Sequence, residues 1–125
     1  MDLSVYYKSI LEQDSAPIVI CDLHHTIIYM NEAACRAYEK RGGRELLGKD
    51  LFGCHNEESK KKIEKVIAYF KEDVSHNIVF TFHNDKENKD VYMVALRDED
   101  KRLIGYYEKH CYRNSEETER YKGIE

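Results

Sequence analysis

Apolar side chains recur at helical spacing in the first segment of the chain. They lie about 3.6 residues apart between residues 3 and 13, and the pattern stops before Pro17, a residue that disfavours helical geometry at the position before it. The segment 1–14 is therefore expected to contain an amphipathic helix. The stripe consists of Leu3, Tyr6, Tyr7, Ile10 and Leu11.

Two short apolar runs follow this helix. Residues 17–22 and 26–30 each have a strand's length, and only Leu23, His24 and His25 separate them, so we expect a hairpin whose turn accommodates two polar rings. Asn31 then stands where a helix N-cap is needed, because its side-chain oxygen can accept from free amides of the first turn. A helix is expected from Glu32 to about Lys40.

The middle of the chain combines short helices with one long one. Glycines at positions 42, 43 and 48 limit residues 41–55 to helical turns. Asn56 can cap the longer helix that follows, with Glu57 and Glu58 near the positive end of its dipole. The inward positions of this long helix follow the spacing i, i+3, i+4 and i+7, and they are Ile63, Val66, Ile67 and Phe70.

From residue 75 onward the pattern becomes extended. Residues 77–84, 90–97 and 103–112 predict three consecutive strands, and in the first of them Ile78, Phe80 and Phe82 are expected to share one apolar face. The order of elements predicts an α+β fold, with an antiparallel sheet covered by helices on one face. Residues 114–125 form a highly charged tail.

Composition and charge narrow the class of protein. The chain has 125 residues, a length that fits one domain, and 42% of them are hydrophobic. A net charge of -4 repels a phosphate backbone, so nucleic acid is not the expected partner. No apolar run reaches the length of a membrane-spanning helix, and the N-terminal residues do not have the pattern of a secretory signal. The spacing of the four cysteines matches neither a disulfide scaffold nor a CxxC motif. These features predict a cytoplasmic protein with reduced thiols.

Four sequence segments in order resemble the PAS domain, a sensory fold of bacterial signalling proteins. They are residues 17–22 (PIVICD), 28–34 (IYMNEAA), 44–49 (RELLGK) and 97–105 (RDEDKRLIG). The resemblance implies a five-stranded antiparallel sheet within residues 15–113, and a pocket between the sheet and the central helices. The candidate pocket residues are Tyr29, Tyr38, Leu47, Leu51, His55, Ile63, Val66, Ile67, Phe70, Phe80 and Tyr107, with Tyr106 as the alternative to Tyr107.

The resemblance also bears on cofactors, and the cofactor of this chain stays unknown. Flavin-binding light-oxygen-voltage members carry an adduct-forming cysteine where this chain has Leu51, which argues against that subtype. In heme-binding members the axial histidine lies inside the long helix and faces the sheet, whereas the inward positions of this helix are apolar and cannot ligate iron. Heme would have to use His55 or Cys54 instead, and is not favoured.

Catalytic and metal sites have few candidates. A small α+β enzyme is the alternative function, with Cys54, His55 or His83 in acid-base or nucleophilic work. However, adjacent side chains such as those of Cys54 and His55 diverge, and no acid is placed to orient the imidazole. No catalytic residue and no metal site are predicted, and His55 is the nearest approach to a metal ligand, because ligand pairs of the CxxC or HxxxH type are missing.

The expected function is therefore that of a sensory or interaction domain. The resemblance implies a domain that binds a small molecule or a protein partner, forms a homodimer through the stripe of the N-terminal helix, and transmits its state by repacking of helices. Many PAS domains end their last strand with an Asp-Ile-Thr step, whereas this chain has Arg113, Asn114 and Ser115. Two alternatives follow, in which the domain either is part of a larger receptor or acts on a separate signalling protein.

Overall fold

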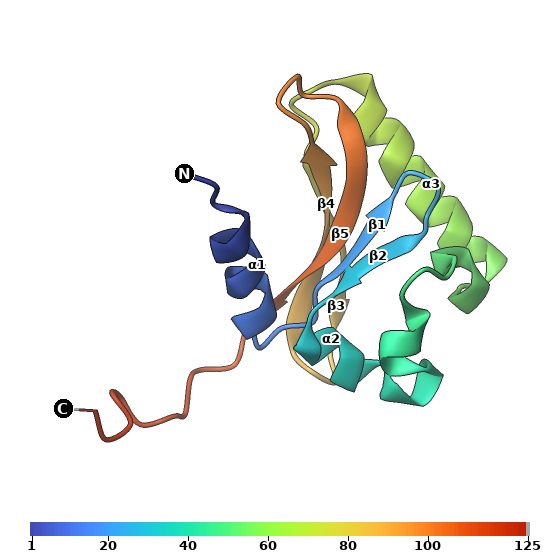
Figure 1. Ribbon diagram of the computed structural model, residues 1–125. Coiled ribbons are helices and arrows are strands. Elements are labelled where there is room, and N and C mark those ends of the chain that lie inside the picture. Colours follow the sequence, from blue (N-terminus) through green and yellow to red (C-terminus); the bar gives the residue numbers. More distant parts are fainter. Residues whose placement is uncertain (125) are drawn as a thin grey trace.

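A five-stranded antiparallel sheet forms the centre of the computed structural model, which describes residues 1–124 apart from the side chain of residue 54 (Figure 1). The strand order is β2-β1-β5-β4-β3. The first two strands form the predicted hairpin, and the last three follow one another as antiparallel neighbours. The bounds are β1 (Val19–Asp22), β2 (Ile27–Met30), β3 (Ile78–Asn84), β4 (Lys89–Arg97) and β5 (Leu103–Tyr112).

The helices confirm the α+β class. In Figure 1, α3 and the short helices lie on one side of the strands, while α1 lies on the other side, where the C-terminal tail also leaves the sheet. None of the helices within residues 1–124 is long and apolar enough to cross a bilayer. The bounds are α1 (Ser4–Gln13), α2 (Glu32–Ala37), η1 (Glu39–Arg41), η2 (Gly43–Leu46), η3 (Leu51–Cys54) and α3 (Glu57–Glu72), where η marks a 3-10 helix.

Both predicted asparagine caps are present. The side-chain oxygen of Asn31 accepts from the Ala34 amide at 2.9 Å, and that of Asn56 accepts from the Ser59 amide at 2.8 Å. The predicted extent of the first capped helix is wrong, because α2 ends at Ala37 and a 3-10 turn continues to Arg41. The tighter turn leads into two glycines with positive φ, a conformation that ends helical geometry.

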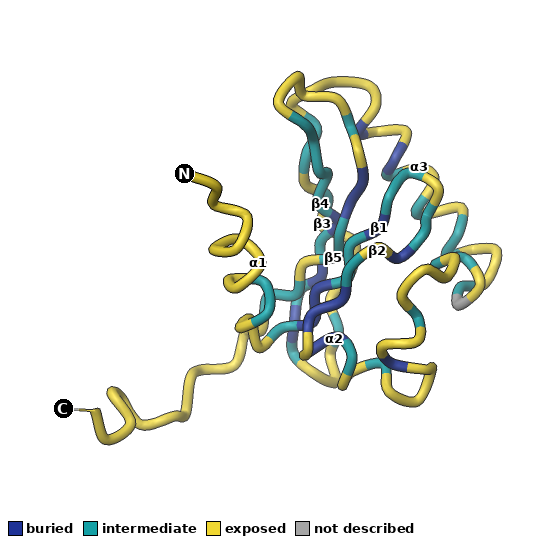
Figure 2. Tube along the Cα trace, in the orientation of Figure 1, coloured by how far each residue is buried: buried dark blue, intermediate teal, exposed yellow. Residues whose placement is uncertain are grey.

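The hydrophobic core lies between the sheet and α3. Figure 2 shows buried positions along the strands, whereas α1 and the tail are exposed. The long helix contributes Ile67 and Phe70, as its periodicity predicts, and β2 contributes Ile27 and Met30. Because Phe70 is fully buried, it anchors α3 to the sheet.

The predicted apolar face of β3 is wrong. Ile78 and Phe80 are 57% and 58% exposed, and Val79 is the residue that packs against the core. The pairing of β3 with β4 shifts between Phe80 and Phe82. An extra residue on an edge strand reverses the phase of its side chains, so a simple two-residue alternation fails here.

Arg97 ties the end of α3 to the sheet. Its guanidinium donates to the carbonyl of Phe70 at 2.6 Å, to that of His76 at 3.2 Å and to the Asn77 side chain at 2.6 Å. Carbonyls at the C-terminal end of a helix have no partner within the helix. Arg97 also donates to the carbonyl of the C-cap Asp73 at 3.2 Å, so one charged side chain satisfies two carbonyls at the end of α3 and holds the helix over the sheet.

Candidate ligand cavity

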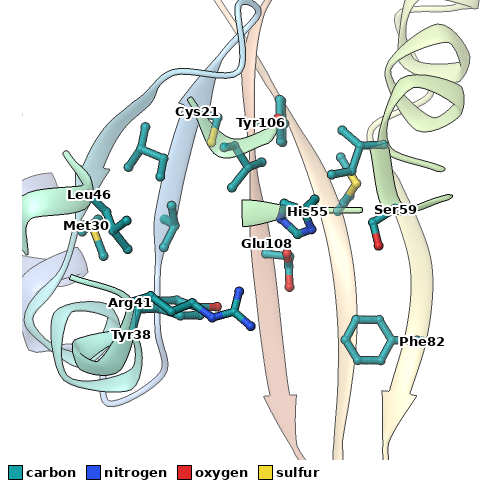
Figure 3. Close-up of a pocket in the computed structure, with 15 residues that line it drawn as sticks. Cys21, Met30, Tyr38, Arg41, Leu46, His55, Ser59, Phe82, Tyr106 and Glu108 are labelled. Carbon is teal, nitrogen blue, oxygen red and sulfur yellow. The ribbon is translucent and has the colours of Figure 1, made fainter. Parts of the chain in front are cut away.

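A cavity of about 330 Å³ lies between the inner face of the sheet and the helices (Figure 3). Its walls come from elements far apart in the sequence, since the five strands form one side and the segment from the end of α2 to α3 forms the other. The size lies near the lower end of the range that small-molecule pockets occupy.

One part of the cavity wall is aliphatic and sulfur-containing. The inner face of the sheet supplies Val19, Cys21, Ile27, Met30 and Met93. The helices supply three further apolar side chains, which are Leu46, Leu51 and Ile63. This part favours an apolar group, because burying such a group there removes it from water without leaving a polar atom unpaired.

The remainder of the wall is polar. Figure 3 shows Arg41 and Tyr38 reaching into the cavity from the helical side, and Glu108 facing it from β5. His55 and Ser59, at the start of α3, complete this polar part, and the ring of Phe82 closes its edge. The cavity is therefore amphipathic, with an apolar part and a polar part.

Tyr106 is held in the sheet wall by a hydrogen bond to the β1–β2 turn. Its hydroxyl lies 2.7 Å from Nδ1 of His25, and the His25 ring stacks on Phe52 with centroids 4.0 Å apart. The expectation that the turn merely accommodates two polar rings is wrong for His25. Burial raises the pKa of Tyr106, and it raises the pKa of the neighbouring Cys21 thiol to about 12, so both groups stay protonated at neutral pH.

Glu108 has an unusual environment for a carboxyl group. Its side chain is 42% exposed because it opens to the cavity, while the loss of hydration around it raises its pKa and the nearby Lys89 acts in the opposite direction. His110, two residues along the same strand, has Nε2 3.9 Å from the Glu108 carboxylate. Burial lowers the pKa of His110 to about 4, so it is neutral and gives Glu108 no ion pair at neutral pH.

His55 is a half-buried imidazole in the cavity wall. Burial lowers its pKa, and the positive charge of Arg41 lowers it further. The ring is consequently neutral at physiological pH and keeps one nitrogen free to accept a hydrogen bond or a metal. Among the described residues, no group of three or more His, Cys, Asp or Glu side chains is placed to hold a metal ion.

The residues proposed from the sequence for the pocket fall into two groups. Four of them line the cavity, namely Tyr38, Leu51, His55 and Ile63. The other seven lie elsewhere. Of the residues on α3, Ile67 and Phe70 are buried in the core and Val66 packs against it. Leu47 is exposed, and Phe80 and Tyr107 lie on the opposite face of the sheet. The hydroxyl of Tyr29 donates to Glu12 of α1 at 2.6 Å.

Most lining residues lie outside the set proposed from the sequence, among them Glu108, Arg41 and Tyr106, the alternative to Tyr107. Tyr106 takes the place of Tyr107 because it pairs with Cys21, whose side chain faces the core. Glu108 follows on the same face, since side chains two residues apart on a strand point the same way. Once it is known which face of the sheet one residue of β5 points to, the two-residue alternation places both Tyr106 and Glu108 toward the cavity. Arg41 stands in a short 3-10 turn, where no periodic signal exists.

The residues of the enzyme alternative do not assemble in the described structure. His83 lies on β3, its Nδ1 2.6 Å from the Asp90 carboxylate, and it does not line the cavity that contains His55. The side chain of Cys54 lies outside the described residues. The described positions therefore separate His55 from His83.

The comparison with protein families matches the model described as PAS domain to residues 15–118. The chain belongs to the PAS domain family. The match covers all five strands and leaves α1 outside, in line with the resemblance seen in the sequence. A search of the curated proteins finds no match.

Solved PAS structures share the architecture at low sequence identity. The PAS domain of a Colwellia psychrerythraea protein is 14% identical over 90% of this chain and 98% of its own, with a TM-score of 0.65. The C-terminal domain of a Streptococcus mutans protein is 20% identical over 85% and 81%, with a TM-score of 0.60. The Aer2 receptor of Vibrio cholerae, described as a dual PAS-heme oxygen sensor, is 15% identical over 76% of this chain and 91% of its own, with a TM-score of 0.54. These likenesses show the fold.

Proposed function

We propose that this PAS domain is a sensor that binds a small molecule in the cavity between sheet and helices and has no catalytic activity of its own. The observation that carries the proposal is the cavity itself, about 330 Å³ in volume and amphipathic in its lining. A module that served only as a scaffold would fill this space with its own side chains. The apolar part supplies affinity through burial, and the polar part supplies orientation.

The bound state would be transmitted through helices that contact the cavity or the sheet. Asn31 links α2 to α1, because its side chain donates to the carbonyl of Leu11 at 3.0 Å, and Tyr29 bonds Glu12 of the same helix. A ligand that favours one packing of the helices would shift the position of α1 and thereby act on a separate signalling protein in the cytoplasm. Neither a membrane nor a nucleic acid is needed.

The first test is to detect the ligand. Native mass spectrometry of freshly purified protein should show an added mass of a small molecule. The Ser59→Trp variant should lose it, because an indole at this lining position fills the cavity. Lys61→Trp is the matched control, since Lys61 is exposed on the same helix and should leave the added mass unchanged. A bare mass for the native chain after incubation with a cell extract would contradict the proposal.

Absorbance spectra of the same samples separate the cofactor alternatives. A Soret band that disappears in His55→Ala would favour a heme sensor, because His55 is the described imidazole in the cavity wall. A flavin spectrum would contradict the argument from Leu51, whose side chain lines the cavity and cannot form a thiol adduct. A colourless adduct would agree with the proposal as stated.

Homodimerisation through α1 is the second expected property. Tyr6, Tyr7 and Ile10 are 59%, 59% and 68% exposed, and none of the helix residues is buried. We expect the double variant Tyr6→Glu, Ile10→Glu to be monomeric in sedimentation velocity under conditions where the native chain is a dimer, because burying two carboxylates at the interface is costly. Lys8→Glu adds the same charge outside the stripe and should remain dimeric. Unchanged sedimentation of the double variant would locate the interface elsewhere.

A further inference from the structure

Two opposite charges share the polar part of the cavity without pairing. Arg41 comes from η1 and Glu108 from β5, and both side chains line the cavity (Figure 3). Among the described residues, no ion pair joins them, and neither charged group makes a hydrogen bond to another side chain or to the backbone; Nε2 of the neutral His110 lies 3.9 Å from the Glu108 carboxylate. The guanidinium is therefore a free set of donors on the wall of the cavity. The Glu108 side chain is 42% exposed where it opens to the same cavity, and its carboxyl oxygens are free acceptors there.

The charges of Arg41 and Glu108 both affect the pKa of the Tyr38 hydroxyl. Burial, together with the Glu108 charge, raises the pKa of Tyr38 to about 12, and Arg41 acts in the opposite direction. Tyr38 consequently stays a neutral hydroxyl that can donate and accept. A ligand head group that enters this part of the cavity meets a positive charge, a negative charge and a hydroxyl together.

This arrangement discriminates among head groups by their charge. A lone carboxylate would pair with Arg41 but would meet the like charge of Glu108, and a lone ammonium would have the reverse problem with Arg41. A head group that buries either residue without satisfying it leaves a charged group unpaired, which costs more free energy than a lost neutral hydrogen bond. A head group with an acceptor and a donor close together satisfies both residues.

We propose that the ligand is a compact molecule with an aliphatic body and a head group that carries an acceptor for Arg41 and a donor for Glu108. The aliphatic body occupies the part of the cavity lined by Met30, Leu46 and Met93. A neutral amide and an α-amino acid both present this head group. This inference rests on the proposed function, because it names the class of ligand for the same cavity.

Four probes with the same carbon chain test the head group. Hexanamide is neutral, norleucine is a zwitterion, hexanoate is an anion and hexylamine is a cation. Titration of the full chain with each probe, followed by the methyl resonances of Met30 and Met93, should give dissociation constants about tenfold lower for hexanamide or norleucine than for the two singly charged probes. The tighter of the two shows whether the natural head group is neutral or zwitterionic.

Two variants should change this preference in opposite directions. Glu108→Gln removes the negative charge and should improve hexanoate binding about tenfold, while Arg41→Gln should improve hexylamine binding to a similar extent. Arg41 is exposed, so its replacement leaves the core intact, and this arm decides the question if Glu108→Gln does not fold. Glu117→Gln and Arg120→Gln, in the exposed tail, are the matched controls and should leave all four constants unchanged.

The outcomes separate this inference from the proposed function. Equal binding of all four probes, or an order of affinity that neither variant alters, would overturn the inference while leaving a cavity that binds small molecules. The absence of binding by any probe would also overturn it. In that case an added mass that Ser59→Trp removes would still support the proposed function.

Discussion

Replacing Asn31 with aspartate is expected to destabilise the domain by about 4 kcal/mol, a large part of the stability of a typical small domain. The Asn31 side chain is fully buried. Its oxygen accepts from the amides of Ile18 and Ala34, and its Nδ2 donates to the carbonyls of Leu11, Asp14 and Ala16. Aspartate keeps the acceptor, but it places a negative charge against the carbonyl oxygens of Leu11, Asp14 and Ala16, which have lost their donor.

Asn56→Asp is the matched control for this prediction. Asn56 caps α3 in the same way, but it is exposed and its described side-chain bond is the acceptance from Ser59. A carboxylate accepts that bond equally well, and its charge is favourable at a helix N-terminus, so we expect a change of at most about 0.5 kcal/mol. Urea unfolding followed by circular dichroism measures both variants. Equal destabilisation of the two would show that Asn31 acts only as a cap.

Gly105→Ala is expected to destabilise the domain by about 3 kcal/mol, through steric conflict in the centre of the sheet. A Cβ at position 105 would lie 2.3 Å from the carbonyl oxygen of Cys21, and this oxygen belongs to the backbone of the neighbouring strand. Gly105 pairs with Asp22 on one side and Leu96 on the other, so β5 cannot move away from β1 without disturbing β4.

Gly53→Ala provides the comparison for the glycine prediction. No atom lies within 4 Å of a Cβ built at position 53, so alanine should be tolerated there, with a change of about 0.5 kcal/mol in either direction. Thermal unfolding of both variants measures the difference. If Gly105→Ala melts at the temperature of the native chain, the close approach of β1 and β5 at this position is incorrect.

Local signals in the sequence predicted the elements well. Asn31 and Asn56 were recognised as caps because the interaction joins residues three positions apart. The long helix was recognised from its apolar spacing, and Ile67 and Phe70 are buried as that spacing requires. Such interactions are completed within one or two turns of the chain, so the sequence contains all the information they need.

Features of the structure that depend on pairing between strands were predicted less well from the sequence. The bulge between Phe80 and Phe82 reverses the phase of β3, and nothing in the local pattern marks its position. Tyr106 and Tyr107 are adjacent identical residues, and only the pairing of Tyr106 with Cys21 decides which of them faces the cavity. A one-residue difference in phase moves a side chain to the other face of the sheet.

The sequence by itself determined the order of the elements, their caps and the PAS family, because these rest on periodicity and on short motifs. The tertiary structure alone decided the chemistry of the cavity. It brings Arg41 from a 3-10 turn and Glu108 from the last strand into one cavity, and it joins His25 to Tyr106 across 81 positions of the chain. Contacts between distant segments depend on strand phase and helix packing, which are properties of the whole fold and not of any local pattern.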